Sequence, residues 1–173
     1  LQLFSPLLDN RLPENIDGLY LGGGFPEIFA GKLAANRGLL EDIGRRLKEG
    51  LPCYAECGGF MYLTEYITVK NGEKHSMVGF FDGHTIMTDR LQRFGYVEIE
   101  FTGENVLGKV GQKARGHEFH HSLVEGITYP KPLELRLPPG KHTGRVHSHR
   151  FLGLPRPGPP FPGHMPRRRM LNC

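Results

Sequence analysis

A short apolar segment, followed by a turn that contains glycine and then by a helical pattern, occurs twice near the start of the chain. The first joins segment 16–21 to a helical stretch over roughly 27–49. The second joins segment 51–55 to a helix that opens at Phe60. Because parallel strands need a long crossover connection, two such units in succession predict a parallel sheet covered by helices. We therefore expect an α/β domain.

The pattern changes after about residue 67. Polar and apolar residues alternate over 96–101, which predicts antiparallel strands with one face in solvent. A further short strand is expected at 1–4, where apolar residues precede a Ser-Pro pair. A chain of 173 residues has room for one sizeable core, so residues 1–151 are assigned to a single domain.

The last stretch, 152–173, has a different composition. It holds six of the 14 prolines of the chain, four arginines and no acidic residue. Because proline lacks a backbone hydrogen-bond donor, this Pro/Arg-rich tail is predicted to be disordered. It also carries the whole net charge of +4, which leaves the rest of the chain neutral. A basic tail can hold phosphates by charge alone, but no basic surface with interleaved aromatic residues is evident elsewhere. Nucleic-acid binding is therefore not expected.

Three further properties concern location. No run of 18 apolar residues is present, so no membrane span is predicted. Three cysteines are an odd number and too few for a disulfide scaffold, which favours a reducing, cytoplasmic setting. The chain starts without Met and without a basic leader segment, and we expect it to begin inside a longer reading frame.

The turn around Cys57 is the strongest candidate for chemistry. Ala55 and Gly59 lie two residues on either side of it, the small-x-nucleophile-x-small spacing of a sharp strand-to-helix turn. The amides of the following helix would favour the thiolate. The alternative is that Cys57 is a small core residue before a glycine turn. Cys53 lies inside the apolar segment and is expected in the core, and a Cys-x3-Cys metal pair would require it to leave the strand.

Glycine and histidine supply two further candidates. The glycine run 22–24 can line a concave site for an anion or oxyanion with backbone N–H groups, or it is an ordinary loop. It lacks the Gly-Lys-Ser/Thr ending of a nucleotide phosphate loop. Histidines cluster over 117–121 and 147–149. A thiol nucleophile needs a base, but the pattern does not choose among five candidates. The spacings match no zinc template, so no metal site is predicted.

Several motifs in series are similar to those of one family. They are the runs 17–27, 35–37 and 54–63, then Gly95-Tyr96, and the run 115–120 followed by Ser122. In this order they resemble the glutamine amidotransferase domain of cobyrinic acid a,c-diamide synthase, and the resemblance covers roughly residues 4–151. It implies a class I (triad-type) glutamine amidotransferase fold, which is flavodoxin-like, with a mostly parallel central sheet.

The resemblance also implies a chemistry. In that family an elbow cysteine attacks the side-chain amide of L-glutamine, forms a glutamyl thioester and releases ammonia. A separate ATP-dependent synthetase domain then amidates the a and c acetate side chains of the corrinoid precursor. By position, Cys57 matches the nucleophile and His147 the histidine that activates it. No cofactor is expected in this domain, whereas ATP and Mg²⁺ are expected in the synthetase domain, which nothing in this chain resembles.

The same resemblance suggests roles for the remaining site residues. The oxyanion amides are expected from Gly23, Gly24 and Gly58, and the pocket near the cysteine is expected to be shaped by a second group: His117, Glu118 and His120. Glu56 is open to two interpretations. It is either a carboxylate at the helix start or a contact to the amino group of the substrate.

The chain departs from the family pattern at both ends. Relatives begin this domain with a further strand and helix, so an N-terminally truncated domain is expected. After His149 they continue with an apolar turn and a closing helix, which the Pro/Arg-rich tail replaces here. Two alternative functions stay open. One is the same domain in nickel-sirohydrochlorin a,c-diamide synthesis, and the other is a non-catalytic module that binds a synthetase partner.

Overall fold

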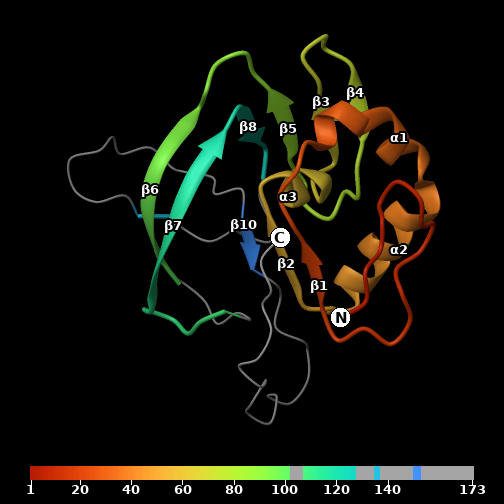
Figure 1. Ribbon diagram of the computed structural model, residues 1–173, viewed down its shortest axis with the longest axis horizontal. Helices are drawn as coiled ribbons and strands as arrows, with labels where there is room; N and C mark the ends of the chain where they lie inside the picture. The colour runs from red at the N-terminus through yellow and green to blue at the C-terminus, as the bar shows by residue number, and fades with distance from the viewer. Residues whose placement is uncertain (102–106, 128–134, 137–149, 153–173) are drawn as a thin grey trace.

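The computed structural model describes residues 1–101, 107–127, 135–136 and 150–152 (Figure 1). Its elements follow in chain order: β1 (Leu19–Leu21), η1 (Pro26–Phe29), α1 (Ala30–Ala35), α2 (Arg37–Lys48), β2 (Cys53–Glu56), α3 (Gly58–Tyr62), β3 (Tyr66–Thr68), β4 (Lys74–Ser76), β5 (His84–Met87), β6 (Arg93–Glu100), β7 (Lys113–His120), β8 (Ser122–Glu125), β9 (Leu135–Arg136) and β10 (Arg150–Leu152). The two successive strand–helix units are present, and the predicted α/β class is confirmed.

The first sheet has the order β1-β2-β10. Strands β1 and β2 are parallel, with Leu19 opposite Cys53 and Leu21 opposite Ala55. The long connection through η1, α1 and α2 makes this pairing possible. Strand β10 adds to β2 in the antiparallel direction. It ends at Leu152, the first residue of the predicted tail, and residues 153–173 lie outside the described part of the chain.

The other two sheets are small. One has the order β4-β3-β5-β8, in which only β3 and β5 are parallel, and the other has the order β7-β6-β9 with antiparallel pairs. Strand β6 confirms the antiparallel segment predicted over 96–101. The described strands thus form three small mixed or antiparallel sheets, and parallel pairing is limited to β1–β2 and β3–β5. Figure 1 shows α1 and α2 on one side, the β6–β7 hairpin on the other, and α3 between them.

The helical stretch predicted over 27–49 is divided at Asn36, whose backbone leaves the helical region at φ −81° and ψ 62°. Its side-chain amide donates hydrogen bonds to the carbonyls of Pro6 (2.9 Å) and Asp9 (2.7 Å). The interruption therefore anchors the N-terminal segment. Beyond it, α2 buries the predicted apolar face of Leu40, Ile43 and Leu47.

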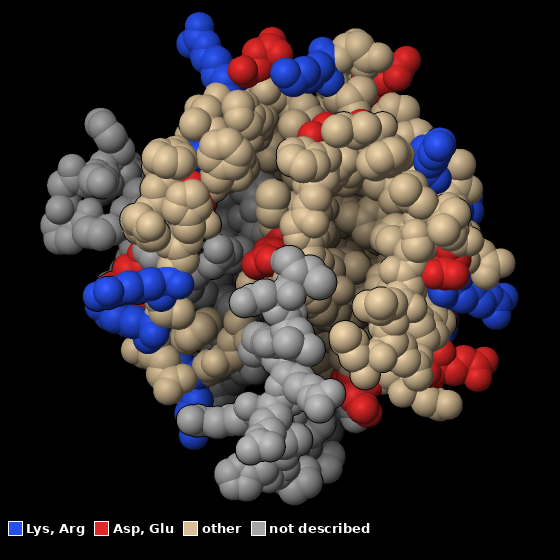
Figure 2. Space-filling view, viewed as in Figure 1, with Lys and Arg blue, Asp and Glu red and all other residues tan. Residues whose placement is uncertain are grey.

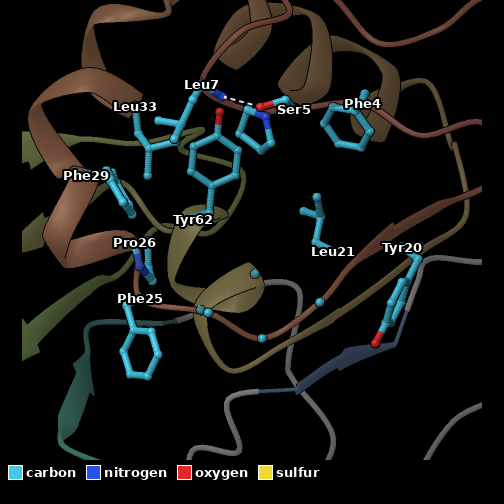
Figure 3. Close-up of a pocket in the computed structure, with 16 residues that line it drawn as sticks. Phe4, Ser5, Leu7, Tyr20, Leu21, Phe25, Pro26, Phe29, Leu33 and Tyr62 are labelled. Atoms are coloured by element: carbon cyan, nitrogen blue, oxygen red, sulfur yellow. Dashed lines mark hydrogen bonds between the residues drawn. The ribbon is translucent and has the colours of Figure 1, made fainter. Parts of the chain in front are cut away.

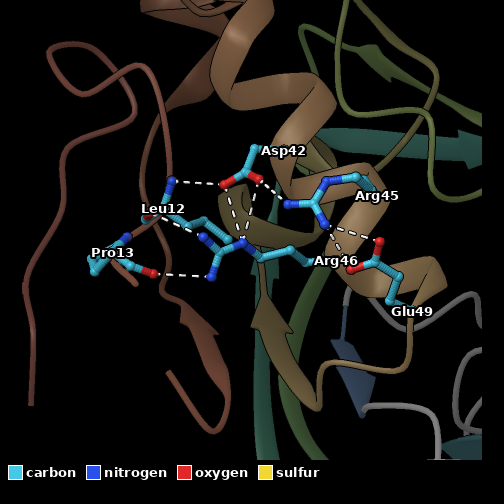
Figure 4. Close-up of polar contacts among 6 residues, drawn as sticks. All are labelled: Leu12, Pro13, Asp42, Arg45, Arg46 and Glu49. Atoms are coloured by element: carbon cyan, nitrogen blue, oxygen red, sulfur yellow. Dashed lines mark hydrogen bonds and ion pairs between the residues drawn. The ribbon is translucent and has the colours of Figure 1, made fainter. Parts of the chain in front are cut away.

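The strand predicted at 1–4 is wrong. Residues 1–5 form no ladder, and Leu1 and Leu3 are exposed. The following loop is held instead by a polar cluster on α2 (Figure 4). There Asp42 accepts a hydrogen bond of 3.0 Å from the Leu12 N–H, and Arg46 donates to the carbonyl of Pro13 at 3.0 Å.

Among the described residues, one hydrophobic core joins the first sheet, α2, α3 and the β3–β5 region. Its largest fully buried side chains are Phe60 of α3 and Phe81 of the β4–β5 connection, whose ring centroids lie 5.1 Å apart. On the face shown in Figure 2, acidic and basic side chains are mixed and lie mostly around the edge. In the part of the chain that the structure describes, no helix has the length and apolar character needed to cross a bilayer.

Candidate active site

Cys57 lies at the turn between β2 and α3, in a backbone conformation that non-glycine residues rarely adopt. Its φ is 49° and its ψ is −116°. Such strain persists only where the surroundings hold it, and it is typical of a nucleophile on a strand-to-helix elbow. The thiol is free and partly exposed. Helix α3 has only five residues, so its dipole at the sulfur is small.

Cys53 has the opposite environment. It faces the core from β2 and is 1% exposed. Burial raises the pKa of its thiol to about 12, because a thiolate there would lose its hydration. The prediction that Cys53 is a core residue is confirmed, and at neutral pH it stays an unreactive thiol.

The two glycines after Cys57 are required by close packing. A Cβ atom on Gly58 would lie 2.5 Å from the carbonyl oxygen of Gly24 and 2.8 Å from Cδ of Pro26. A Cβ atom on Gly59 would overlap the carbonyl oxygen of Leu21. The Gly58 contacts are with the chain that leaves β1, and the Gly59 contact is with the last residue of β1. The elbow therefore packs directly against the glycine loop.

The glycine loop 22–24 lies beside the cysteine. A Cβ atom on Gly23 would lie 3.6 Å from Cβ of Cys57, whereas one on Gly24 would meet nothing within 4 Å. Gly23 and Gly24 are both exposed. The structure thus brings together four of the predicted site residues, namely Gly23, Gly24, Cys57 and Gly58. Their backbone N–H groups are the kind of donor that stabilises an oxyanion.

Glu56 is the last residue of β2, and its carboxylate is held by two tyrosines. Oε1 accepts a hydrogen bond from the Tyr20 hydroxyl at 3.0 Å, and Oε2 accepts one from the Tyr54 hydroxyl at 2.8 Å. The two rings are stacked, with centroids 5.4 Å apart and planes 5° apart. The sequence reasoning missed this cluster, because Tyr20 is 36 positions from Glu56 and only the β1–β2 register brings them together.

The predicted pocket residues 117–120 lie on β7, and successive side chains point to opposite faces of the hairpin. His117 is on the exposed face, 5.4 Å from the Tyr96 ring and 5.5 Å from the Phe94 ring between centroids. Glu118 and His120 are partly buried on the other face. His120 Nδ1 lies 3.0 Å from the carbonyl oxygen of Ser122. Burial lowers the pKa of His120, which favours the neutral ring.

His147 lies outside the described residues, so its role stays a prediction. Arg150, the first residue of β10, is the Cα partner of Glu56. The strand that follows His147 in the sequence therefore runs beside the end of β2, next to the elbow.

A cavity of about 340 Å³ borders the loop and the elbow (Figure 3). Its lining comes from segment 4–7, the end of β1, the glycine loop, η1, α1 and α3. Tyr62 is one of the lining residues, and its side chain is only 3% exposed. Burial raises the pKa of Tyr62, so the phenol stays protonated. No single segment predicts this cavity, because its walls come from distant parts of the chain. Within the described residues, no three His, Cys, Asp or Glu side chains gather as a metal site would require.

Comparison with known proteins agrees with this geometry. Residues 1–151 match the model of the CobB/CobQ-like glutamine amidotransferase domain. A cobyrinate a,c-diamide synthase of Caldanaerobacter subterraneus subsp. tengcongensis is 54% identical over 125 residues, which are 72% of this chain and 28% of that protein. The enzyme of the same name from Clostridium tetani is 50% identical over 70% of this chain and 28% of its own length. That from Dehalococcoides mccartyi is 41% identical over 82% of this chain and 30% of its own length.

The chain thus spans less than a third of the length of these relatives. The family model covers 151 of the 173 residues, including the elbow and the glycine loop. This chain therefore belongs to the CobB/CobQ-like glutamine amidotransferase domain family.

Proposed function

We propose that this chain is the glutaminase part of an ATP-dependent amidoligase that amidates the a and c acetate side chains of cobyrinic acid in cobalamin biosynthesis. The observation that carries the proposal is the strained turn at Cys57, packed against the glycine loop 22–24. The acceptor is taken from the relatives, which are named cobyrinate a,c-diamide synthases. Nickel-sirohydrochlorin amidation uses the same domain type, but these names favour the corrinoid.

In the proposed reaction, the Cys57 thiolate attacks the side-chain amide carbon of L-glutamine. Backbone N–H groups of Gly23, Gly24 and Gly58 stabilise the negative charge that forms on the amide oxygen. The carbon–nitrogen bond then breaks, the nitrogen takes a proton and leaves as ammonia, and a glutamyl thioester remains on Cys57. Water hydrolyses the thioester, which gives glutamate and the free thiol.

His147 is the proposed base that takes the thiol proton and passes it to the leaving nitrogen. The pairing of Arg150 with Glu56 supports this role, because Arg150 follows His147 by only three positions. His117, Glu118 and His120 are proposed to shape the wall of the glutamine pocket.

ATP and Mg²⁺ are assigned to the synthetase part of the longer enzyme. The glycine loop of this chain lacks the Lys and Ser/Thr that hold phosphates and Mg²⁺ in nucleotide-binding loops, so its residues do not fit that group. We propose that the synthetase part binds the corrinoid and receives the ammonia. This chain then needs only to hold glutamine and to release the nitrogen towards that partner.

The domain bounds and the sheet arrangement of the complete domain are also proposals. We assign residues 1–151 to one amidotransferase domain and 152–173 to a disordered Pro/Arg-rich tail. In the longer enzyme, β1 and β2 would belong to a mostly parallel, flavodoxin-like sheet. In support, β1 pairs in parallel with β2, and the connection between them runs through η1, α1 and α2.

Labelling of the purified chain with a glutamine-mimicking diazo-ketone, read by intact mass, tests the proposed function. We expect a single adduct that disappears in Cys57→Ala and persists in the matched control Cys53→Ala. The reason is that, of the two cysteines that the structure describes, Cys57 is partly exposed beside the glycine loop, whereas Cys53 is buried. An adduct that survives Cys57→Ala would contradict the assignment of the nucleophile. Absence of any adduct would contradict the glutaminase proposal and favour a non-catalytic module that binds a synthetase.

A further inference from the structure

The two halves of the proposed site are carried by different strands. β1 leads into the glycine loop, and β2 leads into Cys57. Thioester formation depends on the separation between the attacking sulfur and the N–H groups that receive the oxyanion. Any contact that ties the end of β1 to the end of β2 therefore affects the reaction without touching the substrate.

The Tyr20–Glu56 hydrogen bond is such a contact. Tyr20 lies in β1, one residue before Leu21 and two before the loop, and Glu56 directly precedes Cys57. Their bond of 3.0 Å joins the two strands at the side-chain level. The companion bond from Tyr54, at 2.8 Å, stays within β2. It holds the carboxylate from the same strand but cannot join the strands.

Tyr20 also touches the loop that follows it. A Cβ atom on Gly22 would lie 3.6 Å from the Tyr20 hydroxyl oxygen and 3.6 Å from the nearest ring carbon. One side chain therefore covers the first glycine of the loop and binds the residue before the nucleophile. The Cys57 backbone is strained, and a strained residue keeps its conformation only if its neighbours are held in place.

We propose that Tyr20 is a positioning residue for glutamine hydrolysis. Through Glu56 it fixes the separation between the oxyanion loop and the Cys57 sulfur. This inference rests on the glutaminase function proposed above. A misplacement of about 1 Å at a reacting centre costs about 100-fold in rate, so loss of one hydrogen bond at this position is expected to have a measurable effect on the chemical step.

The test compares Tyr20→Phe with Tyr54→Phe in the 173-residue chain. Each variant keeps its ring and loses one hydroxyl, but only Tyr20→Phe removes the bond between strands. We expect Tyr20→Phe to lower the maximal rate of labelling by the diazo-ketone about tenfold, with the half-saturating concentration unchanged. Tyr54→Phe should lower that rate by less than about threefold. Tyr66→Phe, in β3, is the control for a tyrosine with no assigned role in the site.

Two further measurements separate positioning from a merely structural role. Iodoacetamide reacts with a thiolate without using the oxyanion loop, so its rate with Cys57 should be equal in Tyr20→Phe and the unmodified chain. Hydrogen exchange of the peptide that spans 22–24 should become faster in Tyr20→Phe only.

The inference is overturned if Tyr20→Phe and Tyr54→Phe label equally fast, or if the iodoacetamide rate falls in parallel with the diazo-ketone rate. It is also overturned if exchange over 22–24 does not change. If the unmodified chain and Cys57→Ala both fail to label, the proposed function itself fails, and this inference fails with it.

Discussion

At the scale of single residues, Gly59 is the position where the elbow leaves least room. An alanine Cβ there would overlap the carbonyl oxygen of Leu21 and lie 2.7 Å from its Cβ. Because the obstruction is backbone rather than a flexible side-chain end, β1 or α3 would have to move. We expect Gly59→Ala to lower the free energy of unfolding by about 1–3 kcal/mol, the usual cost of overpacking, as measured by urea denaturation.

Gly24→Ala is the matched control for this stability measurement. It places the same methyl group in the adjoining loop, where nothing lies within 4 Å. Its free energy of unfolding should differ from that of the unmodified chain by less than about 0.5 kcal/mol. If Gly59→Ala and Gly24→Ala lowered the free energy of unfolding equally, the elbow would need the flexibility of glycine rather than its small size.

The sequence predicted the elbow residues because their pattern is local. Ala55, Cys57 and Gly59 lie within five positions, and the small residues next to the nucleophile are needed wherever this turn occurs. The contact between Tyr20 and the predicted site residue Glu56 escaped prediction, because Tyr20 has no local signature. Their contact exists only because the register of β1 and β2 places Tyr20 opposite Tyr54, which shares a strand face with Glu56.

At the scale of elements, Asp42 ties the N-terminal loop to α2 (Figure 4). It accepts from the Leu12 N–H at 3.0 Å and pairs with Arg45 at 2.6 Å and with Arg46 at 3.2 Å. Its side chain is only 10% exposed. We expect Asp42→Asn to lower the free energy of unfolding at pH 7 by about 1.5–3 kcal/mol, the range for hydrogen bonds to a charged group.

This loss should depend on pH. Burial by itself would raise the pKa of the Asp42 carboxyl, but hydrogen bonds from Arg45, the Leu12 N–H and Arg46 outweigh it and hold that pKa below its ordinary value of 3.8. The stabilisation is therefore complete above about pH 3.8 and disappears as the pH falls through the lower folded-state pKa. Urea denaturation of Asp42→Asn and of the unmodified chain should show that the difference between their free energies of unfolding becomes smaller as the pH falls.

Glu49→Gln is the control for Asp42→Asn. Glu49 also binds Arg45, at 2.7 Å, but its side chain is 58% exposed and contacts no loop backbone in the polar cluster described. An exposed ion pair contributes little, so its loss should stay below about 0.5 kcal/mol. If the two variants lost equal stability, the anchoring of the loop by Asp42 would be contradicted.

The success of prediction also differed between elements. The amphipathic face of α2 is encoded by spacing alone, and it was predicted correctly at Leu40, Ile43 and Leu47. The strand expected at 1–4 was wrong because a strand needs a partner as well as apolar residues. The break at Asn36 was missed because its side chain binds carbonyls of Pro6 and Asp9, which lie about 30 positions earlier.

At the scale of the whole molecule, the α/β class followed from the order of the two strand–helix units. The pairing of the remaining strands did not, because sheet membership is decided by contacts between distant segments. β10, for example, joins β2 across more than 90 positions, and in the antiparallel direction. The candidate site likewise depends partly on local sequence and partly on pairing between distant segments. Its nucleophile and glycine loop are local patterns, whereas only the distant β2–β10 pairing brings the strand that follows His147 in the sequence beside the elbow.

The hydrophobic core connects the elbow to the sheet β4-β3-β5-β8, here called the second sheet. Phe81 is central to this core. Its ring is fully buried against Phe60 of α3, although it belongs to the β4–β5 connection. We expect Phe81→Ala to lower the free energy of unfolding by about 3–5 kcal/mol. Because the core is continuous, the elbow should unfold together with the second sheet rather than before it.

This coupling can be measured with two probes in the same denaturant series. Circular dichroism reports the secondary structure of the whole chain, and accessibility of the buried Cys53 thiol reports β2 beside the elbow. The two midpoints should coincide in the unmodified chain and move together in Phe81→Ala. Phe94→Ala, at a ring that is 73% exposed on β6, should move both by a small amount at most. If the circular dichroism midpoint of Phe81→Ala fell while the Cys53 midpoint stayed fixed, the elbow would have a core of its own. Its strained turn would then not depend on the second sheet.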